Sequence, residues 1–368
     1  MTSPFELADD LGPFEVVHIH RPNAGLKAIV VVDNVACGPA IGGTRMAPDV
    51  TLDECARLAR AMTFKNAAAG LPHGGAKSVI MADPKMPMAD KQALIRAFAS
   101  AIRDLKDYIP GPDMGTNEEA MAWVKDETGR AVGLPREIGG IPLDEIGATG
   151  LGVAVSAQVA EEFCDVKVKG AAVAIQGFGA VGEHAARFLA SKGARLVAAA
   201  DSKGTIFDAN GIDVDALTAL KHQGKSVIEF GSGQVLGRED IVGVDCDIWI
   251  PAARPDVLTE NNVGDLKARL VIQGANIPAT PQAEKMLHER GVLIVPDFIA
   301  NAGGVICASV EYHGGSESAA LDAVRDKVSR NTHAVLSKAQ AGNVMPRAAA
   351  VELARERVLK AMSLRRWS

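Results

Sequence analysis

Residues 171–193 read AAVAIQGFGAVGEHAARFLASKG, and this stretch decides how the second half of the chain folds. A short apolar segment runs directly into the pattern G-x-G-x-x-G, and a helical pattern follows at once. The glycines permit a tight turn and close approach of a pyrophosphate, while the helix start supplies oriented N–H donors. The order predicts a strand, a dinucleotide-binding turn and a helix, with cofactor contacts at Gly177, Phe178, Gly179, Ala180, Val181 and Gly182. A glycine-rich turn without a ligand is the alternative.

The segment RLVAAAD ends in Asp201, about twenty residues beyond the glycines, where a dinucleotide fold places an acid. A carboxylate there accepts hydrogen bonds from both ribose hydroxyls of adenosine and disfavours a 2′-phosphate. Asp201 therefore favours NAD over NADP. Ser202 and Lys203 follow it and are able to bind a phosphate, so NADP is not excluded.

Short apolar segments alternate with helical stretches through the second half of the chain: AAVAIQ, RLVAAAD, CDIWIP, RLVIQ and VLIVPD. Such alternation predicts a parallel sheet covered on both faces. Since single cores stop growing at roughly 250–300 residues, a chain of 368 residues predicts two domains separated by a cleft. The expected fold is α/β, with an N-terminal α/β substrate domain over 1–146 and a Rossmann-type domain over 147–330. Amphipathic helices over 331–368 are expected to return to the first domain.

The first half begins with a strand, a Gly/Pro loop and a second extended piece in LKAIVVVDNVACGPAIGGTR, residues 26–45. Thr51 and Glu54 form a T-x-x-E capping box, and apolar residues recur at helical spacing until Gly70. Further helices are expected from Lys91 and from Glu118. The helix that follows the Thr51 cap carries Lys65 near its C-terminal end.

Composition narrows the class of partner. The net charge is −6, and Lys and Arg are scattered among acids, which argues against nucleic acid and favours a small molecule. Five separated cysteines have neither a disulfide pattern nor a zinc-ligand spacing. No apolar run reaches about 18 residues and the N-terminus lacks a signal pattern, so no membrane contact and a cytoplasmic location are expected.

Two lysines, Lys65 and Lys77, flank a turn of small residues in TFKNAAAGLPHGGAKSVI. Gly74 and Gly75 would let a ligand approach the backbone, and two nearby ammonium groups lower each other's pKa. One lysine is suited to hold a carboxylate and the other to act as a base. Asp113, in a Pro/Gly loop ahead of a helix, adds an acid. Alternatively, Lys65 and Lys77 are ordinary surface lysines and Asp113 is a turn residue without a chemical role. The presence of all three residues together disfavours this alternative.

With these residues and motifs, the chain resembles the glutamate/leucine/phenylalanine/valine dehydrogenase superfamily. The resemblance runs through GPAIGGTRMAP, MTFKNAAAGLPHGGAKSVI, PGPDMGTNEEAMAW, GATGLGV, AIQGFGAVG, QGAN, VPDFIANAGGV and AMSLRRW. It implies reversible oxidative deamination of an L-amino acid to a 2-oxo acid and ammonia. It also implies a homo-oligomer built through the first domain.

Carried over residue by residue, the resemblance implies that Lys65 binds the substrate α-carboxylate and Lys77 activates the hydrolytic water. Asp113 matches the acid that moves protons to and from the substrate nitrogen. Three further residues match positions that line the nicotinamide and the substrate: Thr149, Asn276 and Asn301. Structural roles at helix starts or turns compete for these three.

The side-chain pocket departs from the glutamate branch. Relatives that accept glutamate place a lysine in G-P-x-K-G-G and a serine after NAGGV, whereas Ile41 and Ala308 stand at these positions. An unpaired buried γ-carboxylate would cost several kcal/mol, roughly, so a branched-chain or aromatic substrate is expected. The stretch LPHGGAK is more typical of the glutamate branch, and its His73 is expected to be a solvated loop residue.

Other functions stay open. The nearest alternative is a glutamate dehydrogenase with an altered pocket. A relative that binds a dinucleotide without catalysis is disfavoured because Lys65, Lys77 and Asp113 are all present. A Rossmann oxidoreductase acting on hydroxy acids would show no dependence on ammonia.

Overall fold

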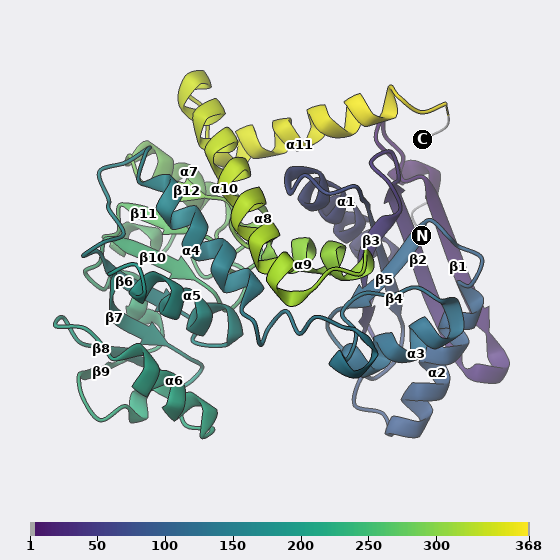
Figure 1. Cartoon of the computed structure of the whole chain (residues 1–368), viewed down its shortest axis with the longest axis horizontal. Coiled ribbons are helices and arrows are strands. Elements are labelled where there is room, and N and C mark those ends of the chain that lie inside the picture. The colour runs from purple at the N-terminus through teal and green to yellow at the C-terminus, as the bar shows by residue number, and fades with distance from the viewer. Residues whose placement is uncertain (1–3, 367–368) are drawn as a thin grey trace. The chain divides into compact units, whose positions relative to one another are not determined.

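The computed structural model describes residues 4–366, and these divide into two compact units. Trp367, in the family-like stretch AMSLRRW, lies outside the described residues. The first unit contains three segments: the chain up to Leu143, Val305–Ala320, and the chain from Val351 onward. The second unit contains Asp144–Gly304 and Leu321–Ala350. Each unit has its own sheet (Figure 1).

The first unit is built on a five-stranded mixed sheet in the order β1-β2-β4-β3-β5. β1 and β2 pair antiparallel, as do β2 and β4, whereas β3 runs parallel to both β4 and β5. Its elements are β1 (Glu15–Arg21), β2 (Leu26–Asn34), β3 (Ala40–Met46), α1 (Leu52–Ala68), β4 (Gly74–Ile80), α2 (Met88–Ala101), β5 (Tyr108–Pro112) and α3 (Glu118–Thr128).

Helices cover both faces of this sheet. Cys55 and Ala59 of α1 pack with Ile29, Val31 and Val79 on one face, while α2 and α3 belong to the core on the other. The predicted cap of α1 is confirmed, since the Thr51 hydroxyl accepts the Glu54 N–H. Because side chains alternate along a strand, Lys77 shares the α1 face with Val79.

The second unit carries a seven-stranded sheet in the order β12-β11-β10-β6-β7-β8-β9. The strands from β12 to β7 are parallel, which confirms the prediction from alternating segments. β8 and β9 extend the sheet antiparallel and have no counterpart in the sequence prediction. Its elements are α4 (Ala148–Ala160), β6 (Ala172–Gln176), α5 (Ala180–Ala190), β7 (Arg195–Ala200), β8 (Thr205–Phe207), α6 (Val214–His222), β9 (Gln234–Leu236), β10 (Ile248–Pro251), β11 (Leu270–Ile272), α7 (Pro281–Glu289), β12 (Leu293–Val295) and α8 (Asp297–Ala300).

The C-terminal helices are α9 (Gly303–Tyr312), α10 (Glu317–Gly342) and α11 (Pro346–Met362). These three helices are shared between the two units, whereas the predicted division placed residues up to 330 in the second domain and residues 331–368 with the first. Most of α9 belongs to the first unit, because Glu311 accepts hydrogen bonds from the N–H groups of Leu134 and Ile141. The start of α11 belongs to the second unit, where Arg347 forms an ion pair with Glu284.

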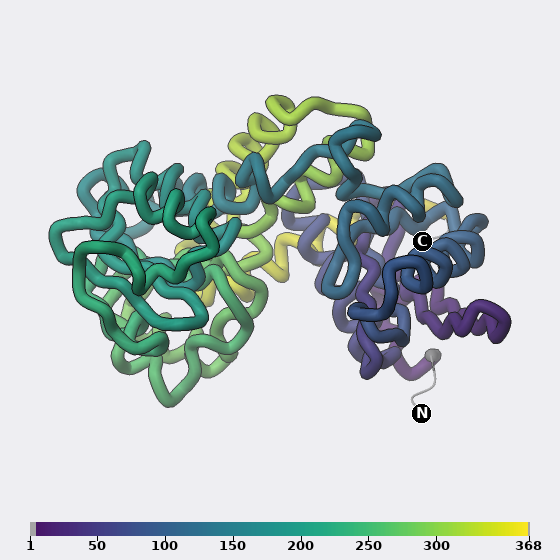
Figure 2. The backbone as a smooth tube through the Cα atoms, turned by 90° about the horizontal axis from the view of Figure 1, so that it is seen from below, coloured from purple at the N-terminus to yellow at the C-terminus, as the bar shows by residue number. Residues whose placement is uncertain are grey.

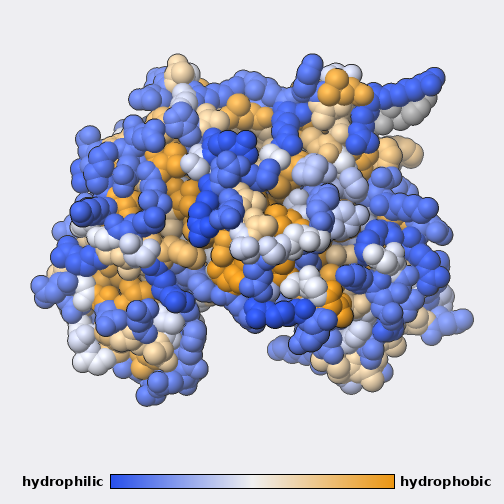
Figure 3. All heavy atoms as spheres, viewed as in Figure 1, coloured by the Kyte–Doolittle hydropathy of each residue, from blue (hydrophilic) through white to orange (hydrophobic). Residues whose placement is uncertain are grey.

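The end of α11 packs against a residue near the start of the chain within the first unit. Figure 2 traces the backbone as seen from below the view of Figure 1. Ala354 and Val358 pack against Leu11, and Arg357 donates to the carbonyls of Ala67 and Leu71 at the end of α1. Hydrophilic residues cover much of the face shown in Figure 3, over both units. No helix among residues 4–366 is long and apolar enough to cross a bilayer.

Candidate active site

Lys77 and Asp113 form an ion pair on the α1 side of the first sheet. Lys77 belongs to β4, and Asp113 directly follows β5. β3 runs between these strands, and a Cβ at its Gly43 would lie 2.9 Å from both the Cβ and the Oδ2 of Asp113. The absence of a side chain at Gly43 therefore allows the acid to reach the lysine.

Arg45 is a third charged residue of this site and was not predicted from the sequence. Its Nη2 lies 3.3 Å from Asp113 Oδ1, and its Nη1 lies 2.5 Å from Glu54 Oε1 on α1. The backbone also fixes Asp113, whose N–H donates to the Thr116 hydroxyl. Arg45 lies within the family-like stretch GPAIGGTRMAP, but no spacing rule links it to Asp113.

Burial lowers the pKa of Lys77 to about 8, since only 5% of the residue is exposed. The positive charge of Arg45 lowers this pKa further, and Lys65 contributes in the same direction. The Asp113 carboxylate opposes these effects by stabilising the charged form. Near neutral pH the site therefore holds a lysine that gives up its proton more readily than an exposed one.

Lys65 lies half-buried in the last turn of α1, as predicted. The neighbouring Asn66 is fully buried, and its Nδ2 donates to the carbonyls of Ile41 and Gly74. This residue was not predicted. It ties the helix that carries Lys65 to both β3 and β4.

Gly74 and Gly75 have a packing role in β4 that was not predicted. A Cβ at Gly74 would lie 1.7 Å from the Asn34 carbonyl oxygen, and one at Gly75 would lie 2.0 Å from the Thr63 nitrogen. The space beside their Cα atoms is filled by the protein's own backbone, which allows β4 to pack tightly against its neighbours. Ligand contact at these two glycines stays a prediction.

Ile41 and Ala308 meet in a small apolar cluster with Ile109 and Val132. Ile41 and Ile109 are register partners in β3 and β5, and Ala308 comes from α9. All four residues are buried. The structure thus brings together the two positions that the sequence analysis selected for side-chain recognition.

His73 is buried and is not the solvated loop residue that was expected. Its Nδ1 lies 3.0 Å from the Pro39 carbonyl oxygen, and its ring packs against Tyr312 and His313. Burial lowers the pKa of its imidazole. Its Nε2 has no hydrogen-bond partner among the described residues.

The glycine-rich turn of the second unit follows β6 and opens α5, as predicted. Gly177 has a φ of 100°, and a Cβ at Gly182 would lie 2.0 Å from the Gly177 carbonyl oxygen. The N–H groups of Gly177 and Phe178 both donate to the Ala200 carbonyl. Gly179 is the N-cap, with no capping side chain, and Ala180 is exposed. The uncapped helix start is suited to a pyrophosphate, which fits the predicted dinucleotide.

Asn301 and Asn276 meet in the second unit, where Asn301 Nδ2 lies 2.9 Å from Asn276 Oδ1. The Oδ1 of Asn301 is buried and has no hydrogen-bond partner within residues 4–366, so an acceptor is available there for a ligand N–H. Thr149 lies in the first turn of α4, and a Cβ at Gly303 would lie 2.9 Å from its Cα. These polar groups fit the carboxamide end of a nicotinamide dinucleotide.

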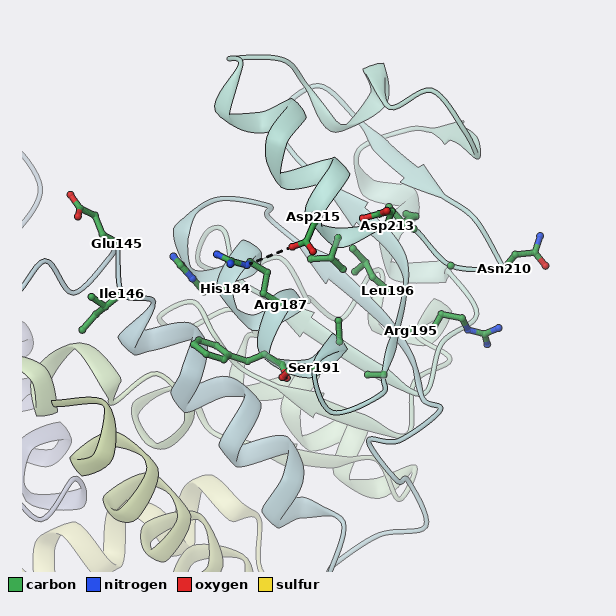
Figure 4. Close-up of a pocket in the computed structure, with 16 residues that line it drawn as sticks. Glu145, Ile146, His184, Arg187, Ser191, Arg195, Leu196, Asn210, Asp213 and Asp215 are labelled. Carbon is green, nitrogen blue, oxygen red and sulfur yellow. Dashed lines mark hydrogen bonds and ion pairs between the residues drawn. The ribbon is translucent and has the colours of Figure 1, made fainter. Parts of the chain in front are cut away.

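A cavity of about 950 Å³ lies elsewhere in the second unit (Figure 4). Arg187 points towards Asp215 across it, with 3.9 Å between their charged atoms. None of the predicted site residues lines this cavity. It is therefore separate from the dinucleotide turn.

Family models match both parts of the chain. The Glu/Leu/Phe/Val dehydrogenase dimerisation domain matches residues 13–130, and the Glutamate/Leucine/Phenylalanine/Valine dehydrogenase domain matches residues 139–366. The chain belongs to this family. It is accordingly an NAD(P)-dependent amino-acid dehydrogenase, an oxidoreductase acting on CH–NH₂ groups. The family resemblance predicted from the sequence is confirmed, whereas the leucine/valine branch is not.

Several relatives of this dehydrogenase are glutamate dehydrogenases. That of Aeropyrum pernix is 38% identical, over 91% of this chain and 85% of the relative. The NADP-specific glutamate dehydrogenase of Saccharolobus shibatae is 36% identical, over 90% and 83% of the two chains. The NAD-specific enzyme of Staphylococcus aureus is 34% identical, over 91% and 85%. Relatives of this dehydrogenase thus include enzymes specific for either dinucleotide.

Solved structures agree with the fold. The hetero-hexameric glutamate dehydrogenase from Thermus thermophilus, in its leucine-bound form, has a TM-score of 0.83 and 30% identity, covering 96% of this chain and 90% of that one. L-tryptophan dehydrogenase from Nostoc punctiforme has a TM-score of 0.78 and 27% identity, covering 97% and 99%. Similar structures therefore include enzymes for different amino acids.

Proposed function

We propose that this dehydrogenase oxidatively deaminates an apolar L-amino acid, branched-chain or aromatic, to its 2-oxo acid and ammonia, in a reversible reaction. The observation that carries the proposal is the apolar cluster of Ile41, Ile109, Val132 and Ala308. A γ-carboxylate placed against these four side chains would lose its hydration without gaining a partner. An aliphatic or aromatic side chain gains from the same burial.

Lys65 is proposed to bind the substrate α-carboxylate as a point charge. A bound nicotinamide dinucleotide supplies the chemistry of accepting the substrate Cα hydrogen as hydride. Gly179 and Ala180 are proposed to hold its pyrophosphate, and Thr149, Asn276 and Asn301 its nicotinamide end. Loss of hydride leaves an iminium carbon on the substrate.

Lys77, in its neutral form, is proposed to take a proton from the water that attacks this carbon. Asp113 is proposed first to take a proton from the substrate ammonium and later to return it to the nitrogen of the carbinolamine. The nitrogen then leaves as ammonia, and the hydroxyl gives up its proton as the carbon becomes a ketone. Overall, amino acid, oxidised dinucleotide and water become 2-oxo acid, ammonium, reduced dinucleotide and a proton. The contact between Lys77 and Asp113 supports these roles as base and acid, since a proton can pass directly between the two side chains.

Glutamate is the second candidate substrate, and the comparisons favour it over an apolar amino acid. The similar curated proteins of Aeropyrum pernix, Saccharolobus shibatae and Staphylococcus aureus are all named glutamate dehydrogenases. For glutamate to bind, a group other than residues 41 and 308 would have to meet its side-chain carboxylate.

We also propose that the first unit binds the substrate and assembles the chain into a homo-oligomer, as the dimerisation-domain match supports. The second unit is proposed to bind the dinucleotide. The five cysteines are free thiols, which supports a reducing, cytoplasmic location.

The test compares kcat/KM for L-leucine, L-valine, L-phenylalanine, L-tryptophan and L-glutamate with purified protein. We expect an apolar amino acid to exceed glutamate by at least roughly a hundredfold. A preference for glutamate would contradict the pocket argument and establish the second candidate.

A further inference from the structure

The carboxylate of Asp201 is saturated by donors from the protein itself. Its Oδ1 accepts from the Lys203 N–H at 2.9 Å and from the Ser226 hydroxyl at 2.8 Å. Its Oδ2 accepts from the Lys221 ammonium at 2.7 Å and from the Val227 N–H at 3.0 Å. A carboxylate offers about four lone-pair sites, so these four donors use all of them.

This saturation differs from the sequence prediction that Asp201 binds the adenosine ribose. Two ribose hydroxyls need acceptor sites that Lys221 and Ser226 already occupy. The ion pair with Lys221 also offsets the negative charge that would repel a phosphate. Asp201 therefore lacks both properties by which an acid at this position selects NAD.

The cavity beside Asp201 is lined by cations instead. It has a volume of about 480 Å³ and lies between the glycine-rich turn and the segment that follows β10. Lys221, Arg238 and Arg254 line it, while Asp201 is the one acid among its lining residues. Ser202 also lines it and is exposed.

Arg238 and Arg254 keep N–H donors that their ion pairs with Glu239 do not use. Arg254 Nη2 lies 3.1 Å from Glu239 Oε1, and Arg238 Nη2 lies 2.6 Å from the same oxygen. Each guanidinium carries five N–H donors, so a single shared carboxylate oxygen leaves several on each side chain. Both side chains are about half exposed, which lets them turn towards an anion.

We infer that this cavity binds the 2′-phosphate of an adenine dinucleotide through Arg238 and Arg254, with the Ser202 hydroxyl beside them. The chain therefore uses NADP at least as readily as NAD. The inference rests on the proposed dinucleotide role of the second unit. A subsite for the 2′-phosphate thus lies where the sequence pattern predicts that Asp201 binds the two ribose hydroxyls.

Calorimetric titration of the full chain with NAD and with NADP, at one pH and one ionic strength, tests this inference. We expect the Kd for NADP to be equal to or lower than the Kd for NAD. A Kd for NADP more than tenfold higher would overturn the phosphate subsite. If neither dinucleotide bound, the proposed function itself would fail, and the two failures are thus distinguishable.

The double variant Arg238→Gln/Arg254→Gln locates the subsite. Because charge-assisted hydrogen bonds to phosphate are lost, we expect NADP binding to weaken by about ten- to a hundredfold more than NAD binding. Arg325→Gln, on the exposed side of α10, is the matched control and should change neither Kd. Equal weakening of both dinucleotides in the double variant would contradict the assignment to the 2′-phosphate.

Discussion

Lys77 reaches Asp113 beside Gly43 of β3, whose lack of a side chain leaves room for their contact. Arg45 of the same strand holds the other oxygen of the carboxylate. The site therefore depends on a base, an acid and a cation brought together by three neighbouring strands. Each of these features has a measurable consequence.

The pH dependence of turnover follows from the pKa of Lys77, which burial lowers to about 8. Since the neutral amine is the proposed base, kcat/KM should rise with pH, pass its midpoint near 8 and then level off. Below the midpoint the lysine is protonated and cannot accept the proton of water. A midpoint near 10.5, the ordinary lysine value, would show that burial does not tune this group.

Gly43→Ala should lower kcat by about a hundredfold, because a Cβ 2.9 Å from Asp113 Oδ2 displaces the carboxylate from Lys77. Gly264→Ala is the control, since a Cβ there meets nothing within 4 Å. Steady-state kinetics, with circular dichroism to establish folding, checks the prediction. Unchanged kcat in the Gly43 variant would mean that the contact is not needed for turnover.

The apolar cluster can be tested by restoring the polar residues of the glutamate branch. Ile41→Lys with Ala308→Ser should raise the ratio of kcat/KM for glutamate to that for the best apolar substrate by roughly a hundredfold. The added ammonium and hydroxyl would give a side-chain carboxylate its partners. No change in the ratio would place substrate recognition elsewhere.

Arg347 should be important for stability rather than chemistry. It lies 2.7 Å from Glu284 and 2.9 Å from Asp297, both of which are 5% exposed. Arg347→Met leaves two buried carboxylates unpaired, so urea unfolding should show a loss of about 3–5 kcal/mol. Arg330→Met breaks an exposed pair with Asp326 and should cost under about 1 kcal/mol. Equal effects of the two variants would contradict this reasoning.

Much of the fold could be predicted because its signals are local. The glycine-rich turn after β6 and the Thr51 cap of α1 were predicted from adjacent residues. β8 and β9 were not, since these three-residue strands lack the longer apolar runs that contain β11 and β12 in RLVIQ and VLIVPD. The helix predicted from Lys91 covers KQALIRAFASAIRDLKDYI, whereas α2 ends at Ala101 and Tyr108 begins β5, where burial between strands outweighs the helical spacing.

The sequence singled out Lys77 and Asp113, which contact each other in the structure, and Lys65, which is near enough to lower the pKa of Lys77; the role of each residue stays a prediction. Arg45 and Asn66 were missed because their roles depend on contacts between strands and α1. The packing of Gly74 and Gly75 against neighbouring backbone was also missed, because it depends on strands that are distant in the sequence. Asp201 matched its motif, but only the structure shows that its oxygens are already occupied.

The most direct test of the account measures ammonia released and dinucleotide reduced in the same reaction, for the wild type and for Lys77→Met. We predict one ammonia per reduced dinucleotide from an L-amino acid in the wild type, and a loss of both products in the variant. Reduction of the dinucleotide without ammonia, or a Lys77→Met variant with full turnover, would contradict oxidative deamination at the Lys77–Asp113 site.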